Sequence, residues 1–159
     1  MVAVYSPVEL LSNIYAISPN DWLGLTVRLT VALLTGAMIG WEREIRNKPA
    51  GLRTHMLVSF GSALFVLVPI LSGVTDNRPE DLTRVIQGII GGIGFLGGGV
   101  ILHESQSPSQ ERRVRGLTTA AAIWVSAALG TAAGCGLWQI SLIAAALTFL
   151  VLRVFKKLE

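Results

Sequence analysis

The chain has 159 residues, of which 52% are hydrophobic and only 14% are charged, and its mean hydropathy is +0.60. This composition leaves too little polar surface to cover a soluble globule, so it favours a single compact membrane protein. The net charge is +3. Because the basic residues lie in short segments between apolar runs, we attribute this excess to membrane topology and not to nucleic-acid binding. The single Cys135 excludes an intrachain disulfide and a cysteine-based zinc site.

The first 21 residues contain no Lys or Arg, so they lack the basic region that begins a signal peptide. Apolar residues at helical spacing within 7–17 predict a short helix that lies in the membrane interface. We therefore divide the chain into an N-terminal interfacial segment, 1–21, and a single transmembrane helical domain, 22–159. Asp21 lies where it can cap the first helix of that domain.

Five apolar runs follow, each long enough for a membrane-spanning helix or nearly so. The first begins and ends with tryptophan, as is typical of residues at the two membrane interfaces. The sequence predicts an all-α, polytopic helical membrane bundle with five transmembrane helices. The predicted spans are 22–41, 52–72, 83–102, 117–133 and 138–152.

Charge sets the predicted orientation. Most basic residues fall between spans one and two, between spans three and four, and after span five, whereas the opposite side has only Arg78 and Arg84. Since cytoplasmic loops are enriched in Lys and Arg, we expect the N-terminus outside the cell and the C-terminus in the cytoplasm.

The third span lies within 84–104, a stretch that is unusually rich in glycine. In membrane helices small residues let neighbouring backbones approach closely, so we interpret this segment as the buried central helix of the bundle. The alternative is a flexible glycine-rich loop, which the intervening Ile, Leu, Phe and Val disfavour. The predicted helix-packing glycines are Gly88, Gly91, Gly92, Gly98 and Gly99.

Spans three and four repeat parts of spans one and two. Gly36 and Glu42 correspond to Gly98 and Glu104 at one offset, and a second offset relates the starts of spans two and four. This pattern suggests a parallel duplication of a two-helix hairpin. Chance similarity between Gly- and Ala-rich helices is the alternative.

Polar side chains gather at the predicted cytoplasmic ends of these hairpins. One interpretation is an ion or anion site, since Mg²⁺ can bind through one or two carboxylates and keep several waters. The other is a layer that caps helix N-termini and anchors the bundle. No spacing matches a dedicated metal cage, so no metal ligand is assigned. The candidate cluster is Glu42, Arg53, His55, His103, Glu104 and Arg115.

Arg28 is an intramembrane charge near the outer end of span one. Ionisable residues within spans are functional candidates, but we expect Arg28 to snorkel to water or to pair with Gln87 or an outer-loop acid. The sequence contains no triad, P-loop or zinc-protease motif, so we predict no enzyme activity, no catalytic residue and no cofactor.

Three stretches resemble the MgtC/SapB family of bacterial inner-membrane proteins. They are GAMIGWEREIRNKPAGLRTHMLV at 36–58, IIGGIGFLGGGVIL at 89–102 and RGLTTAAAIWVSAALG at 115–130. The resemblance implies a multi-pass protein of the bacterial inner membrane that is linked to growth at low magnesium and, in pathogens, to survival inside macrophages. It also implies regulation through membrane partners such as ATPases and the ATP synthase.

Two features depart from the family pattern. Many members continue into a soluble cytoplasmic domain, whereas this sequence ends at Glu159, and Cys135 matches no clear family position. We expect a regulator of a membrane partner or an ion balance, in contact with the lipid bilayer and not with nucleic acid. The alternative is a small cation channel or carrier, and homo-oligomerisation fits either interpretation.

Overall fold

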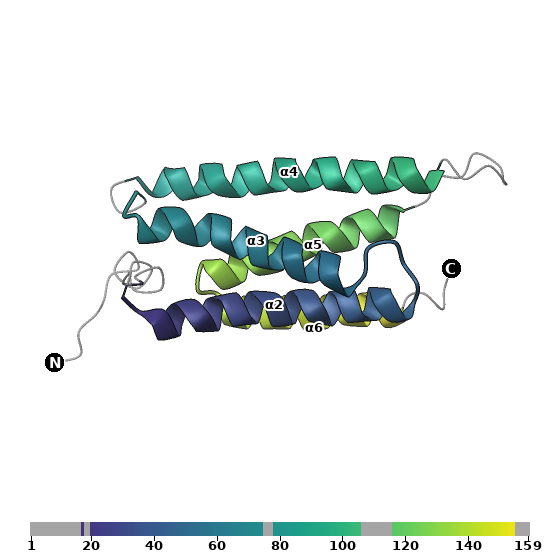
Figure 1. Ribbon diagram of the computed structural model, residues 1–159, viewed down its shortest axis with the longest axis horizontal. Helices are drawn as coiled ribbons and strands as arrows, with labels where there is room; N and C mark the ends of the chain where they lie inside the picture. Colours follow the sequence, from purple (N-terminus) through teal and green to yellow (C-terminus); the bar gives the residue numbers. More distant parts are fainter. Residues whose placement is uncertain (1–16, 18–19, 75–77, 106–115, 155–159) are drawn as a thin grey trace.

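The computed structural model describes residues 17, 20–74, 78–105 and 116–154. These residues form five α-helices that run side by side along one long axis (Figure 1). The all-α fold is confirmed, and each predicted span matches one helix to within a few residues. The predicted interfacial helix at 7–17 lies outside the described residues except for Ile17. The helices are α2 (Trp22–Ile45), α3 (Leu52–Leu71), α4 (Pro79–Ser105), α5 (Leu117–Gly134) and α6 (Trp138–Val154).

Four of the described helices, α2 to α5, are long and apolar enough to cross a membrane. Helix α6 is apolar but has 17 residues, so it is about 25 Å long at a rise of about 1.5 Å per residue. That length is at the lower limit for a transmembrane helix. The chain therefore folds as a multi-pass membrane bundle with one short helix.

The predicted helix boundaries have clear local causes. The Asp21 side chain accepts a hydrogen bond from the Gly24 amide at 2.9 Å, which confirms its role as the N-cap of α2. Gly116 precedes α5 with φ of 84°, and Gly136 has the same φ in the turn between α5 and α6. Glycine adopts this left-handed conformation at little cost, so both positions allow the chain to turn sharply.

The core of the bundle is the seam between α3 and α5, which run in the same direction. A Cβ added at Gly134 would lie 2.8 Å from the carbonyl oxygen of Ala63, and one added at Gly130 would overlap the backbone of Ser59. One turn earlier, His55 contacts Ser126. The two helices therefore keep one register over several turns, and the glycines let their backbones approach closely.

Helix α2 packs against α3 through a second pair of glycines. A Cβ added at Gly36 would lie 2.6 Å from the carbonyl oxygen of His55, and one at Gly40 would lie 2.7 Å from Cα of Leu52. Ser59 also donates a hydrogen bond to the carbonyl oxygen of Ala32 at 2.7 Å. Helix α3 is thus held between α2 and α5, each of which contributes glycines spaced four residues apart.

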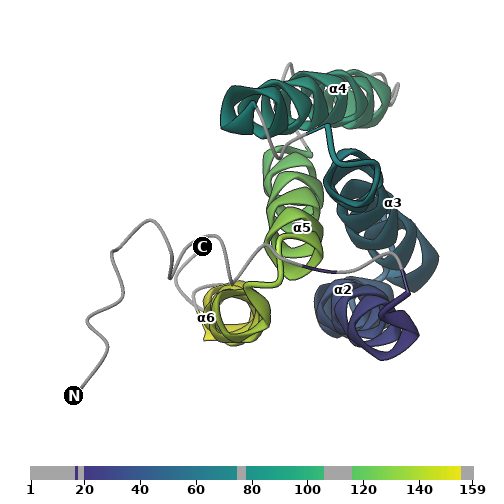
Figure 2. The same cartoon turned by 90° about the vertical axis from the view of Figure 1, so that its left-hand side faces the viewer.

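Helix α6 completes this core on the side of α2 and α5 (Figure 2). The buried hydroxyl of Ser141 donates to the carbonyl oxygen of Leu129 at 2.9 Å and lies 3.4 Å from the hydroxyl of Thr35. One small polar side chain therefore connects α6 to both neighbouring helices.

The prediction that the glycine-rich segment forms the buried central helix is wrong. Helix α4 lies at the edge of the bundle, over α3 and α5 (Figure 2), and only 6% of its membrane-spanning window is buried within the chain. The closest packing in the described part of the bundle involves glycines of α2 and α5 instead. Glycine density alone does not determine which helix becomes central, because lipid can cover a glycine face as well as protein can.

The five glycines predicted to pack against neighbouring helices do not do so within the chain. A Cβ added at any of them would meet no atom within 4 Å, whereas one added at Gly97 would lie 3.4 Å from Cβ of Ala120 on α5. Gly98 is open although its counterpart Gly36 is tightly packed, so the two proposed hairpins differ in packing. The duplication itself stays a prediction. The five glycines that were predicted to pack against neighbouring helices are Gly88, Gly91, Gly92, Gly98 and Gly99.

We predict that Gly130→Ala destabilises the protein even though alanine is the better helix former. The added methyl group must overlap the Ser59 backbone, and overpacking of this kind costs about 1–3 kcal/mol. We expect the melting temperature in detergent, measured by circular dichroism, to fall by several degrees.

Gly94→Ala is the matched control, because a Cβ at Gly94 meets nothing within 4 Å. Its melting temperature should stay the same or rise, since alanine favours a helix over glycine by about 1 kcal/mol. An equal fall in melting temperature in the two variants would contradict the close packing of α3 against α5.

Candidate functional site

Charged and polar side chains converge in the interior near the end of the bundle where α2 ends and α3 begins. Glu42 and Arg43, in the last turns of α2, are only 4% and 2% exposed, and His55 in the first turn of α3 is fully buried. Charged groups at this depth are costly unless they are paired. Their arrangement therefore defines the candidate site.

Glu42 lies between two guanidinium groups. The Arg43 Nε contacts Glu42 Oε2 at 2.7 Å, and the Arg46 Nε contacts Glu42 Oε1. The side chains of Glu42 and Arg43 are equally buried, whereas Arg46 is partly exposed. With two cations and one carboxylate, this group carries a net positive charge.

His55 connects the charged group to α5. Its Nδ1 lies 2.9 Å from the Ser126 hydroxyl, which in turn donates to the Ala122 carbonyl oxygen at 3.1 Å. The charges of Arg43 and Glu42 are close enough to act on the imidazole ring. Helices α2, α3 and α5 therefore all contribute to one buried polar layer, which consists of Glu42, Arg43, His55 and Ser126.

Three buried atoms of this layer, Glu42 Oε1, Arg43 Nη1 and His55 Nε2, have no well-aligned hydrogen bond, although Glu42 Oε1 is in the ion pair with Arg46 and the Ala50 backbone acts on the His55 ring. Buried polar atoms usually have a protein or water partner. An arginine N–H donates and a carboxylate oxygen accepts, so a water molecule or a small polar ligand would suit them. The net positive charge disfavours a bare divalent cation, and no group of three or more potential metal-ligating side chains occurs among the described residues.

The structure brings together only part of the cluster predicted from the sequence. Glu42 and His55 share the buried layer, whereas Arg53 and His103 are exposed. The side chain of Glu104 and all of Arg115 lie outside the described residues.

Two members of the layer were missed in the sequence. Arg43 was assigned to the basic loop because it follows the first apolar run, although it lies within α2. Ser126 resembles any small residue of an Ala-rich helix. Its spacing of four residues from Gly130 was the available signal, because both then fall on one face of α5.

The sequence also suggested that Glu42 could cap the following helix, and this is wrong. Glu44 has that role, because its Oε2 accepts a hydrogen bond from the Leu52 amide at 2.9 Å at the start of α3. The Glu44 carboxylate is thus placed at the positive end of the helix dipole. Glu42 instead faces inward to the two arginines.

Arg28 lies at the opposite end of the bundle and has a partner that the sequence did not suggest. Its Nη1 donates to the Gly134 carbonyl oxygen at 3.0 Å. That carbonyl is at the C-terminal end of α5, where the helix dipole favours a positive charge. The charge of Asp21 also acts on Arg28. Snorkelling and a contact with Gln87 stay predictions.

Cys135 is buried beside this arginine, in the turn after α5. Burial raises the pKa of the thiol, and the nearby positive charge of Arg28 partly opposes that increase. The thiol is therefore protonated at neutral pH and is poorly placed for nucleophilic chemistry.

We predict that Glu42→Gln strongly destabilises the protein. The substitution keeps the side-chain shape but leaves the buried guanidinium of Arg43 without its counter-charge, which typically costs about 3–5 kcal/mol. Unfolding in a series of urea concentrations in mild detergent would measure the loss.

Glu44→Gln, two residues away, should cost about 1 kcal/mol or less because that carboxylate is an exposed cap. Adding Arg43→Met to Glu42→Gln removes both buried charges and should recover part of the stability. If the double variant is less stable than Glu42→Gln alone, the buried charges of Glu42 and Arg43 do not stabilise each other as we infer.

A second prediction concerns thiol reactivity. Because the folded-state pKa of Cys135 is raised, its thiolate fraction at about pH 8 is smaller than that of an unfolded cysteine. Alkylation by iodoacetamide should be slow in the folded protein, rise with pH and become fast in denaturing detergent. Arg28→Gln removes the charge that opposes the shift, so it should slow the folded-state reaction further; acceleration without unfolding would contradict this account.

Comparisons with known proteins place this chain in a family. Residues 29–159 match the MgtC family. The chain is 48% identical to Protein SrpB of Synechococcus elongatus over 153 residues, which cover 92% of this chain and 83% of SrpB. It is 41% identical over 138 residues to a protein of Escherichia coli named Putative magnesium transporter YhiD, a match that covers 83% of this chain and 60% of YhiD.

Protein MgtC of Salmonella typhimurium is 43% identical over 118 residues, which cover 74% of this chain and 46% of MgtC. The chain therefore spans little more than half of YhiD and about half of MgtC. No solved structure matches the chain significantly. The match over residues 29–159, together with these relatives, shows that the chain belongs to the MgtC family.

Proposed function

We propose that this chain is a multi-pass protein of the bacterial inner membrane that supports growth when magnesium is scarce by modulating a membrane partner. In pathogens the same role would support survival inside macrophages. The observation that carries the proposal is the buried polar layer, whose charges pair with one another inside a tightly packed three-helix core. This packing suits a rigid scaffold better than a pathway for ions.

The proposed orientation follows the distribution of charge in the folded chain. Among the described residues, the end of the bundle where α2 and α6 terminate has four Arg or Lys residues outside the buried layer: Arg46, Lys48, Arg53 and Arg153. The positive-inside rule assigns this end to the cytoplasm, with the N-terminus outside the cell. The proposed membrane partners are ATPases or the ATP synthase, and neither enzyme activity nor nucleic-acid binding forms part of the proposal.

The alternative is a small channel or carrier for a cation such as Mg²⁺. Two observations favour it: the name of the relative YhiD, Putative magnesium transporter, and the three polar atoms of the buried layer that have no well-aligned hydrogen bond. A carrier would need these atoms to become accessible to water during transport. The two candidates therefore differ in whether the polar layer conducts ions.

We predict that the chain restores growth at low magnesium to a bacterial strain that lacks its own MgtC-family protein. Glu42→Gln should abolish this effect by disturbing the core, whereas Glu44→Gln should retain it. Protein levels in the membrane fraction, measured by immunoblot, would separate loss of function from loss of protein.

The same variants distinguish the two candidate functions after purification. In liposomes loaded with a fluorescent magnesium indicator, the wild-type chain should give no flux above that of empty liposomes. Robust flux that Glu42→Gln or Glu104→Gln abolishes would overturn the modulator proposal and support a carrier.

A further inference from the structure

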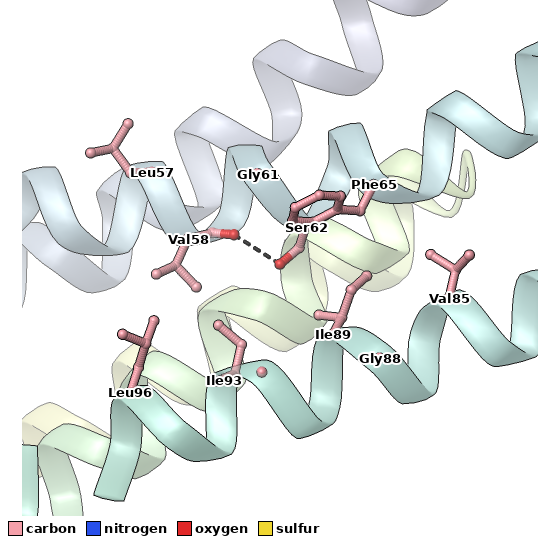
Figure 3. A pocket seen from close by; sticks show the side chains of 11 residues that line it. Leu57, Val58, Gly61, Ser62, Phe65, Val85, Gly88, Ile89, Ile93 and Leu96 are labelled. Carbon is pink, nitrogen blue, oxygen red and sulfur yellow. Dashed lines mark hydrogen bonds between the residues drawn. The ribbon is translucent and has the colours of Figure 1, made fainter. Parts of the chain in front are cut away.

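The peripheral position of α4 leaves a cleft between α4 and α3. Its volume is about 710 Å³, and apolar side chains line both walls. Figure 3 shows Ile89 and Ile93 of α4 pointing toward α3, with Val58 and Ser62 on the opposite wall. The Ser62 hydroxyl donates to the Val58 carbonyl oxygen at 2.8 Å, so its polarity is satisfied within its own helix. The cleft is therefore apolar near the middle of α3 and α4.

Glycines give this cleft its shape. Gly61 on α3 and Gly88 and Gly92 on α4 line it, and a Cβ added at any of the three would meet no atom within 4 Å. Glycine inside a helix costs about 1 kcal/mol relative to alanine. Within the described chain no packing contact compensates for that cost. Because glycine has no side chain, these three positions leave room for a molecule from outside the chain.

A second cavity of about 470 Å³ continues the cleft toward the basic end of the bundle. The two cavities share Leu96, and the second adds polar groups from Thr54 and His103. At a rise of about 1.5 Å per residue, Gly92 and His103 are separated by about 16 Å along α4. This is close to half of the roughly 30 Å hydrocarbon thickness of a bilayer. The cleft therefore extends from the membrane centre to one interface.

Two basic residues adjoin the polar end of the cleft in the sequence. Lys48 precedes the lining residue Pro49, Arg53 precedes Thr54, and both cations are exposed. The nearby Glu44 carboxylate is engaged at the amide of Leu52. An anionic group at this end would be attracted by both cations, as in other basic pockets between transmembrane helices.

We propose that this cleft binds one anionic phospholipid, with an acyl chain between α3 and α4 and the phosphate beside Lys48, Arg53 and His103. An inserted transmembrane helix, about 10 Å wide and 27 Å long, would occupy roughly 2,000 Å³. The two cavities, of 710 and 470 Å³, therefore admit only one face of such a helix. An acyl chain is thin enough for the cleft, and a phospholipid combines an apolar body with a charged end in the order that the cleft requires.

Native mass spectrometry of the whole chain in mild detergent, with added phosphatidylglycerol, tests this site. The wild-type chain should retain one phosphatidylglycerol molecule. In Gly88→Leu and Gly92→Leu the leucine side chain fills the apolar cleft. We therefore expect the fraction of protein with bound phosphatidylglycerol to fall by about tenfold or more. Gly61→Leu, which fills the cleft from α3, should have the same effect if either α4 variant fails to fold.

Gly91→Leu and Gly94→Leu are the matched controls. Both glycines are on α4 and are open to added atoms, but neither lines the cleft, so occupancy should stay at the wild-type value. Equal losses in the cleft and control variants would overturn the proposal. A wild-type dimer that Gly88→Leu dissociates would also overturn it, because the occupant would then be a second copy of the chain.

Competition between phosphatidylglycerol and phosphatidylcholine tests whether the site prefers an anionic headgroup. We expect Lys48→Gln with Arg53→Gln to weaken the preference for phosphatidylglycerol by about 30-fold, given the usual contribution of each cation near an anionic lipid. Arg153→Gln is the control, since Arg153 is at the same end but lies over Phe149 of α6. No preference in the wild-type chain would rule out the anionic site.

Discussion

The structure depends on the close approach of α3 to α2 and α5. In lipid the hydrophobic effect does not drive helices together, so van der Waals contact between backbones and interhelical hydrogen bonds hold them. Gly36 and Gly40 provide this contact on α2, and Gly130 and Gly134 provide it on α5. Because the α3–α5 contact fixes the register of those two helices, it also brings His55 against Ser126.

The buried polar layer and the cleft between α3 and α4 are two consequences of this packing. Three tightly packed helices bury Glu42, Arg43 and His55 at one end, where the charges stabilise one another. Helix α4 does not take part in that core and packs on α5 through Gly97. Its remaining glycines are therefore available to molecules in the membrane. A rigid core beside a helix with open glycines suits the proposed role of modulating a membrane partner.

Much of the fold could be predicted from the sequence. Hydropathy and run length located all five helices, and the Asp21 cap and the turn at Gly136 follow from local chemistry. The position of α4 could not be predicted in this way, because glycine-rich faces can meet protein or lipid. Glycine spacing does not distinguish the two cases either, because Gly88 and Gly92 on α4 have the same four-residue spacing as Gly130 and Gly134 on α5 and yet meet no atom within 4 Å. Arg43 was missed because charge patterning alone cannot distinguish a buried helix end from a loop.

The central claim is that α3 packs in register between α2 and α5, and cysteine cross-linking in native membranes tests it most directly. In a Cys135→Ala background, the pair His55→Cys and Ser126→Cys should form a disulfide on mild oxidation, because the two native side chains are in contact. The pair His55→Cys and Gly134→Cys, two turns out of register, should not. Cross-linking of Ser126→Cys to Gly92→Cys, with none to His55→Cys, would place α4 at the centre of the bundle and contradict the account.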